Sequence, residues 1–283
     1  MSEHFCTYET AWCPGCGNFS ILESLKRALN ELGKDPYEVL MVGGIGQAAK
    51  LPQYISANSF CGLHGRALPA AAAAKLSNDN LTVIVDSGDG DSYGEGGNHF
   101  IHNIRRNVNI THFIHDNQIY GLTKGQASPT SDLGFVTGVQ VSGNINNPLN
   151  PVALAITLGA GFVARAFSGD MQQLIEIMKA AIEYDGYAMV DILQPCVSFN
   201  KINTFSYYKN RVYHLNESYD PSNKLIALEK SMEFGERIPT GILYLEKNKQ
   251  SFSKKNEVLS QGIPLIDVSE DSSIISKLTA NLV

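Results

Sequence analysis

The first residues that could carry chemistry form a set of oxygen donors. Gly88-Asp89-Gly90-Asp91 and, further along, Asn117 each follow a short run rich in β-branched residues. If those runs are neighbouring parallel strands, Asp89 and Asn117 meet at one edge of a sheet. A carboxylate, an amide oxygen and a nearby backbone carbonyl suit Mg²⁺, and glycines let backbone N–H groups approach a diphosphate. The alternative is an ordinary buried β-α-β unit with a Gly-Asp turn.

Sulfur donors form the second group. The chain has five cysteines, Cys6, Cys13, Cys16, Cys61 and Cys196. The close pair in Cys13-Pro-Gly-Cys16 is more typical of metal binding or redox chemistry than of a structural disulfide in a reducing compartment. A zinc site on the same cysteines is the alternative. Cys6 fits no pattern.

These donors need a scaffold, and hydrophobic periodicity predicts one. We expect five strands alternating with five helices. The alternation predicts an α/β fold with a mainly parallel sheet and helices on both faces. The expected strands are 39–42, 81–86, 110–115, 162–166 and 188–193; the expected helices are 21–32, 68–76, 96–106, 151–158 and 171–181.

The expected domain organisation is one domain over residues 1–199, followed by an extension. From residue 200 the alternation is expected to stop, because residues 200–283 show short, mixed segments. We therefore expect this C-terminal extension to pack on the domain or on a partner subunit.

Composition excludes several classes of protein. The 283 residues are 43% hydrophobic and 18% charged, as in a globular enzyme, and the net charge is −6. Without a basic block, nucleic-acid binding is not expected. No apolar run approaches the roughly 20 residues of a membrane span, and no signal peptide is visible. We therefore expect a cytoplasmic protein that does not contact a membrane.

Eight segments, taken in order, resemble the β subunits of 2-oxoacid:ferredoxin oxidoreductases, the pyruvate and 2-oxoglutarate family. The eleven-residue block at 120–130 is the most distinctive of them. The resemblance implies a thiamine diphosphate-binding fold over residues 1–199. The segments are Trp12–Asn18, Gly44–Gly46, His64–Arg66, Gly88–Asp91, Gly96–His99, Arg105–Asn107, Tyr120–Thr130 and Gln194–Cys196.

The resemblance also implies an activity and its partners. Such enzymes decarboxylate a 2-oxoacid on thiamine diphosphate, transfer the acyl group to coenzyme A, and pass electrons through an iron–sulfur cluster to ferredoxin. They work as a β subunit joined to an α subunit, so a heterodimer at least is expected. Pyruvate, 2-oxoglutarate and branched-chain 2-oxoacids all remain open as substrates.

Cofactor-binding residues follow from the same resemblance. Asp89, Asn117 and the carbonyl of Ile119 are expected to hold Mg²⁺. His64 is expected either to donate to a diphosphate oxygen or to be a structural histidine. The remaining residues expected at the cofactor are Gly46, Gly88, Gly90, Asp91, Gly121, Leu122 and Thr123.

The cluster site departs from the family pattern. A 4Fe–4S cluster held by four cysteines is implied, and Cys13, Cys16 and Cys196 match three of the positions. The fourth position holds Gln47, which leaves the cluster type open. Cys61 is expected either to supply the missing thiolate or to be a small buried cysteine.

Substrate contacts and the activating acid complete the expected site. Lys50 or Lys124 is expected to pair with the substrate carboxylate, unless both are merely solvated, and Leu122 to pack against cofactor or substrate. No glutamate lies in a context that suits activation of the aminopyrimidine ring, and Glu95 is assigned to the dipole of the following helix. In the family the activating glutamate comes from another subunit, so this chain is expected to be half an active site.

Two rival functions stay open from the sequence. One is a thiamine-dependent 2-oxoacid decarboxylase subunit without redox function, supported mainly by Gln47. The other is a non-catalytic binding module that retains the fold. The cysteine pair argues against the first rival, and the Asp89/Asn117 pair argues against the second.

Overall fold

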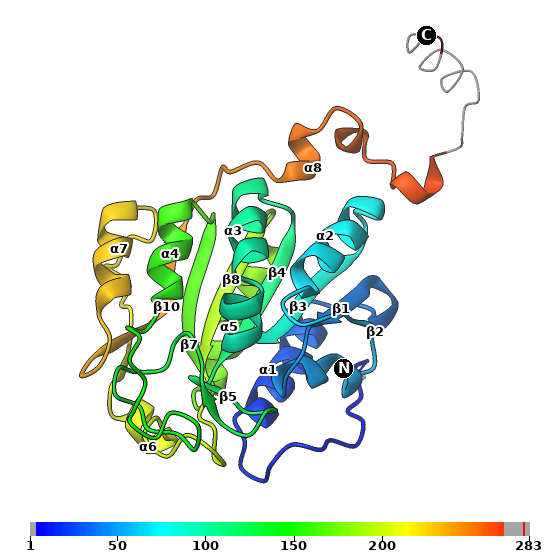
Figure 1. The fold of residues 1–283 in the computed structure, drawn as a ribbon. Helices are drawn as coiled ribbons and strands as arrows, with labels where there is room; N and C mark the ends of the chain where they lie inside the picture. Colours follow the sequence, from blue (N-terminus) through cyan, green and yellow to red (C-terminus); the bar gives the residue numbers. More distant parts are fainter. Residues whose placement is uncertain (1–3, 269–279, 281–283) are drawn as a thin grey trace.

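An eight-stranded sheet forms the centre of the molecule (Figure 1). The computed structural model describes residues 4–268 and 280. The strand order is β2-β1-β3-β4-β8-β7-β10-β9, and every neighbouring pair is parallel except β10 with β7. The strands are β1 (Val39–Gly43), β2 (Asn58–Cys61), β3 (Thr82–Gly88), β4 (Ile110–Asp116), β7 (Phe162–Phe167), β8 (Tyr187–Leu193), β9 (Val212–His214) and β10 (Ile238–Leu245).

Helices cover both faces of the sheet (Figure 1). One face carries α1 (Asn18–Glu31) and α5 (Met171–Glu183). The other carries α2 (Ala67–Ser77), α3 (Gly97–Arg106), α4 (Pro151–Leu158) and α7 (Lys224–Met232). The short helices α6 (Phe205–Lys209) and α8 (Phe252–Lys255) lie between later segments, and β5 (Ile119–Tyr120) pairs with β6 (Gln126–Ala127) in a separate hairpin.

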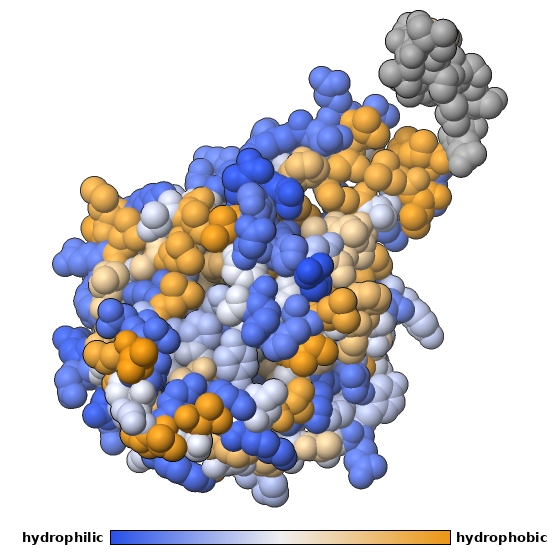
Figure 2. Space-filling view, viewed as in Figure 1, coloured by the Kyte–Doolittle hydropathy of each residue, from blue (hydrophilic) through white to orange (hydrophobic). Residues whose placement is uncertain are grey.

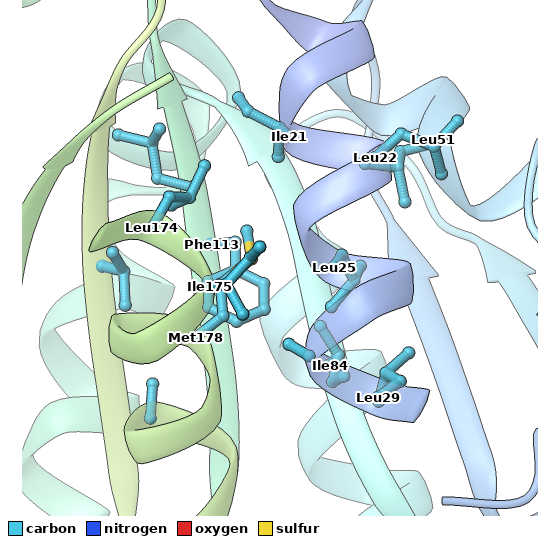
Figure 3. Packing of buried hydrophobic residues seen from close by; sticks show 14 of the residues in the cluster. Ile21, Leu22, Leu25, Leu29, Leu51, Ile84, Phe113, Leu174, Ile175 and Met178 are labelled. Atoms are coloured by element: carbon cyan, nitrogen blue, oxygen red, sulfur yellow. The ribbon is translucent and has the colours of Figure 1, made fainter. Parts of the chain in front are cut away.

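Two hydrophobic cores result from this layering. On one side Ile21 and Leu25 of α1 and Met178 of α5 gather over Phe113 of the sheet (Figure 3). Ile114, the next residue along β4, belongs to the opposite core beneath α2, α3 and α4. Neighbouring strand residues point to opposite faces, so a strand buried on both faces is apolar throughout much of its length.

The predicted α/β class is confirmed, and each of the ten predicted elements is present within a few residues of its expected bounds. The predicted strand count was wrong, because β2, β9 and β10 also join the sheet. β2 is an exposed edge strand and carries no apolar alternation. β9 has only three residues, and β10 contains Pro239 and Gly241, which are unusual inside strands.

The expectation that alternation stops at residue 200 was also wrong. The chain continues as α6, β9, α7 and β10, and β10 returns to pair antiparallel with β7. Ile238 and Leu243 of β10 are fully buried. This segment is therefore part of the sheet, while its packing on a partner subunit stays a prediction. Among the described residues, no helix is long and apolar enough to cross a membrane.

Candidate functional site

Parallel strands bring the candidate residues to one edge of the sheet. β1, β3, β4 and β8 run in the same direction and end at Gly43, Gly88, Asp116 and Leu193. The loops after all four ends therefore lie together, which is where α/β sheets bind ligands. These loops carry Asp89, Asn117 and Cys196, whereas Cys13 and Cys16 lie in the segment before α1.

One cavity of about 80 Å³ collects every residue predicted to bind the cofactor. Ile45, Gln47, Ala48 and Tyr120 complete its lining. Pockets for drug-sized ligands usually measure about 300–1,000 Å³, so this cavity can enclose only part of such a ligand. The predicted residues lining it are Gly46, His64, Gly88, Asp89, Gly90, Asp91, Asn117, Ile119, Gly121, Leu122 and Thr123.

Asp89 is buried and held by two hydroxyl groups. Asp89 directly precedes the π-helical turn Gly90–Glu95 and is 1% exposed. The Oδ2 atom accepts hydrogen bonds from Ser128 Oγ at 2.5 Å and Thr130 Oγ1 at 2.6 Å. Burial raises the pKa of the Asp89 carboxyl, and the two hydroxyl groups lower it. A carboxylate held this firmly is a preorganised metal ligand.

A second carboxyl group lies directly behind Thr130. Thr130 Oγ1 is 2.8 Å from Asp116 Oδ1 as well as 2.6 Å from Asp89 Oδ2. A hydroxyl group carries a single hydrogen, so it cannot donate to two carboxylates at once. Burial and the nearby Asp191 raise the pKa of Asp116 well above its ordinary value. Thr130 therefore bridges two buried carboxyl groups through a single hydroxyl group.

The turn after β4 presents the remaining oxygen donors. Gln118 adopts a left-handed backbone conformation with φ of 58°. In this turn the Ile119 N–H donates to Asn117 Oδ1 at 3.1 Å, and Asn117 Nδ2 donates to Gln194 Oε1 at 3.1 Å. The Asn117 amide is thereby oriented, with its oxygen toward the Ile119 peptide. The sequence points to Asn117 and Ile119, but it gives no sign of the positive φ at Gln118.

Asp91 joins three separate segments, a role the sequence did not indicate. Its Oδ1 atom accepts hydrogen bonds from Ile45 N at 3.1 Å and Gly65 N at 2.8 Å. His64 Nδ1 lies 2.5 Å from the same oxygen. A Cβ atom on Gly44 would sit 2.0 Å from Asp91 Oδ2. Asp91 thus fixes the loops after β1 and β2 around the cavity, and one ring nitrogen of His64 is already engaged.

Glu95 faces a tyrosine and not the start of a helix. It is the last residue of the π-helical turn, and α3 begins only at Gly97. Its carboxylate accepts a hydrogen bond from Tyr120 Oη at 3.1 Å and lies 3.7 Å from His64 Nε2. The predicted role in the helix dipole was therefore wrong. Among the described residues lining the cavity there is no glutamate.

The residues expected to contact substrate are only partly gathered. Leu122 lines the cavity and is 40% exposed. Lys50 lies in the 3₁₀ helix Ala48–Gln53, and Lys124 lies at a turn with φ of 79°; neither side chain lines the cavity. The pairing of either lysine with a substrate carboxylate stays a prediction.

Three of the cysteines surround a second cavity of about 50 Å³. Cys13, Cys16 and Cys196 line it together. Each sulfur accepts a hydrogen bond, from Ser198 Oγ to Cys13 at 3.1 Å, from Gln194 Nε2 to Cys16 at 3.5 Å and from the Phe199 N–H to Cys196 at 3.5 Å. Donors to sulfur are among the features by which proteins tune iron–sulfur clusters. The sequence relates these cysteines to one another only through the family resemblance, whereas the fold brings all three to one cavity.

The chemistry of these thiols favours metal ligation over free redox activity. Burial, with smaller contributions from the neighbouring Cys196 and Cys13, raises the pKa of the Cys16 thiol to about 11. A thiol that stays protonated is a poor nucleophile, but a coordinating metal deprotonates it. In the part of the chain that the structure describes, no three His, Cys, Asp or Glu side chains are placed to hold a single metal ion.

Gln47 and Cys61, the two candidates for the fourth ligand, lie in different places. Gln47 lines the cysteine cavity and the larger cavity as well. Cys61 is exposed on β2, where its sulfur accepts a hydrogen bond from Gln53 Nε2 at 3.4 Å. Cys61 does not line the cysteine cavity, and the alternative that it is a small buried cysteine was wrong because it is exposed.

Comparison with known families matches most of the chain. Residues 42–192 match the family described as thiamine pyrophosphate enzyme, C-terminal TPP binding domain. Residues 196–261 match a second family, described as the C-terminal part of the pyruvate ferredoxin oxidoreductase beta subunit.

Individual relatives agree with these matches. The chain is 44% identical over 277 residues to subunit beta of 2-oxoacid:ferredoxin oxidoreductase 2 from Aeropyrum pernix, covering 93% of this chain and 90% of that protein. It is 48% identical over 257 residues to subunit beta of the 2-oxoacid:ferredoxin oxidoreductase from Saccharolobus solfataricus, covering 86% and 84%.

A solved structure is similar over nearly the whole chain. The 2-oxoglutarate:ferredoxin oxidoreductase from Magnetococcus marinus, with 2-oxoglutarate, coenzyme A and succinyl-CoA bound, superposes with a TM-score of 0.89. The identity is 37%, and the superposition covers 96% of this chain and 92% of that one.

Proposed function

The chain belongs to the β subunits of the 2-oxoacid:ferredoxin oxidoreductases, and from that premise we propose how its own residues serve the reaction. The family is a redox family, so the decarboxylase alternative without redox function does not hold. We propose roles for the two cavities, for the electron route between them and for the α subunit.

The larger cavity suits thiamine diphosphate with Mg²⁺. The observation that carries this proposal is that Asp89, Asn117 and Ile119 line one cavity with the loop glycines. Asp89, the Asn117 amide oxygen and the Ile119 carbonyl would hold the metal, because hard oxygen donors are the ligands it prefers. When bound, the cofactor supplies the carbanion chemistry of decarboxylation.

The chain's own residues keep this donor set in place. Ser128 and Thr130 hold the Asp89 carboxylate through Oδ2. Gln194 holds the Asn117 amide through its Nδ2 group. Asp91 holds the Ile45 and Gly65 backbone at the cavity wall. Hydrogen bonds within the chain thus fix each loop that carries a metal ligand before the cofactor binds. This lowers the entropy cost of ordering these loops on binding.

The cysteine cavity suits an iron–sulfur cluster that takes electrons from the thiamine cavity. Gln47, Asn117 and Gly121 line both cavities, so the two adjoin. Cys13, Cys16 and Cys196 would bind iron as thiolates. We assign electron transfer to ferredoxin by this route, and transfer of the acyl group to coenzyme A.

The α subunit would complete the site. Among the described residues lining the thiamine cavity there is no glutamate, and the cavity is small. The 2-oxoacid would therefore bind between the subunits, with Lys50 or Lys124 as candidates to bind its carboxylate.

All five cysteines are free, as is usual in reducing compartments, which supports a cytoplasmic enzyme.

Replacing Asp89 by Asn tests the cofactor assignment. The enzyme assembled with its α subunit is titrated with thiamine diphosphate and Mg²⁺ by calorimetry. Loss of a charged ligand is expected to cost about 2–3 kcal/mol, or roughly 30- to 160-fold in affinity. Asp220→Asn, which changes a carboxylate outside the cavity, serves as the matched control. An Asp89→Asn enzyme with wild-type affinity contradicts the assignment.

A further inference from the structure

Gln47 lines the cysteine cavity beside the three thiols, as do the amides of Asn18, Asn117 and Gln194. The Oε1 atom of Gln47 is buried and has no hydrogen-bond partner in the described residues. Its backbone carbonyl, in contrast, accepts a hydrogen bond from Trp12 Nε1 at 2.8 Å. A buried polar atom without a partner needs an explanation, and an ion or group bound in the cavity supplies one.

Cys61 is kept away from this cavity by the sheet. It pairs with Gly43 in the parallel register of β2 and β1. The next residue, Gly62, donates its N–H to the Gly43 carbonyl at 2.8 Å. Cys61 thus lies on a paired edge strand and outside the lining of the cysteine cavity. Of the two candidates for the fourth ligand, Gln47 is therefore the one that already lies beside the three thiols.

We infer that the cluster of this enzyme is held by three thiolates, with its fourth iron facing the Gln47 amide oxygen. The inference rests on the proposed cluster and specifies its ligands. A neutral amide oxygen is a weak ligand to a cluster iron compared with a thiolate. This iron is consequently the one that is lost first. Because Gln47 also lines the thiamine cavity, the iron that faces Gln47 is on the side of the cluster next to that cavity.

Loss of this iron is a balanced one-electron oxidation. The [4Fe–4S]²⁺ cluster yields [3Fe–4S]⁺, one Fe²⁺ ion and one electron. Ferricyanide, added as the oxidant, accepts the electron and becomes ferrocyanide. The three-iron product is paramagnetic in the oxidised state, whereas [4Fe–4S]²⁺ is not, so the step is visible by electron paramagnetic resonance.

The test compares three forms of the enzyme assembled with its α subunit and purified without air. They carry the wild-type β chain, Gln47→Cys or Cys61→Ser. Each is treated with one equivalent of ferricyanide per cluster, and released iron, residual iron and sulfide, and the oxidised-state spectrum are recorded. Any cluster in the partner contributes equally to all three, and thermal unfolding midpoints check that the variants fold.

The wild type is expected to release iron and to show the three-iron signal. Cys61→Ser is expected to behave in the same way. In Gln47→Cys a fourth thiolate binds this iron, so iron release is expected to slow by roughly tenfold or more. A fourth form, Gln47→Leu, replaces the amide by a shorter apolar side chain and is expected to release iron at least as fast as the wild type.

Two results overturn the inference, and they are distinct. If Cys61→Ser lowers the iron content while Gln47→Cys changes nothing, Cys61 is the ligand and the proposed cluster stands. If none of the assembled enzymes contains more iron or sulfide than the α subunit alone, the proposed cluster is wrong and the inference fails with it. The calorimetric test of Asp89 is independent of both results.

Discussion

At the scale of single residues, Thr130 decides the protonation of the site. It lies between the buried carboxyl groups of Asp89 and Asp116, within 2.6 Å and 2.8 Å of their oxygens. One hydroxyl hydrogen cannot serve two carboxylates, so one of the acids must be protonated. Burial raises the pKa of both acids, and the nearby carboxylates of Asp191 and Asp89 add to this effect at Asp116.

Thr130→Val is expected to destabilise the fold by about 1–3 kcal/mol, because it removes a hydroxyl group that is hydrogen-bonded to buried carboxyl groups. Thr130→Ser keeps the hydroxyl group and is the matched control. Urea unfolding of the two variants separates the hydroxyl from the methyl group. Equal destabilisation by Val and Ser would show that packing, and not the hydroxyl bridge, is what Thr130 supplies.

At the scale of elements, β4 combines an apolar core strand with buried polar contacts. His112 Nδ1 is 2.8 Å from Tyr187 Oη on β8, and His112 Nε2 is 2.9 Å from Ser87 Oγ on β3. Three residues on, His115 lies between Asn18 of α1 and Asp86 of β3. These contacts tie β4 to both neighbouring strands and to a helix, so the strand that ends just before Asn117 is fixed in register.

The buried His112 predicts a pH dependence of stability. Burial lowers the pKa of His112 to about 3, against about 6.5 in the unfolded chain. Between these values the unfolded state binds the proton that the folded state excludes. Stability from His112 is thus complete above pH 6.5 and is lost as the pH falls toward 3, by at most about 1.4 kcal/mol per pH unit.

Other groups have the opposite sign, so a variant is needed to isolate this effect. Burial raises the pKa of Asp191 to about 6, so its contribution to stability increases as the pH falls below that value. Between pH 7 and 5 the wild type is expected to lose about 2 kcal/mol relative to His112→Gln. Urea unfolding at both pH values measures the difference. Parallel pH profiles for the two proteins would contradict the prediction.

At the scale of the whole molecule, we propose that the chain forms one side of a composite active site. The thiamine cavity is small and, among the described residues, is lined by no glutamate. Apolar side chains are exposed along the C-terminal arm beyond α8, which extends away from the sheet (Figures 1 and 2). They are Val258, Ile263, Leu265, Ile266 and Val268. Exposed apolar surface of this kind is typical of contacts between subunits.

The isolated chain is expected to turn over no 2-oxoacid, because we propose that the α subunit supplies the activating acid. Reduction of a viologen dye is followed with pyruvate, 2-oxoglutarate and a branched-chain 2-oxoacid, each with coenzyme A. Adding the α subunit should restore activity with at least one of them. Asp89→Asn assembled with α is the matched inactive control. Substantial dye reduction by the chain alone would contradict the proposal that it forms only half of the active site.

The sequence by itself determined the central elements of the fold and the residues that line the larger cavity. Strand and helix patterns depend on neighbours along the chain, so β1, β3, β4, β7 and β8 were predicted within a few residues. Because parallel strands end at one edge, the gathering of Asp89, Asn117 and the glycine loops in one cavity followed from those patterns together with the family motifs.

Only the tertiary structure decided which contacts hold those residues and where the segments without a clear sequence pattern lie. The contacts of Asp89 with Ser128 and Thr130, and of Asp91 with Ile45 and Gly65, join segments tens of residues apart. Edge strands such as β2, and loops such as the one carrying Gln47, have no periodicity that reveals their position. Their place follows from packing against distant parts of the chain, which the pattern of neighbouring residues does not encode.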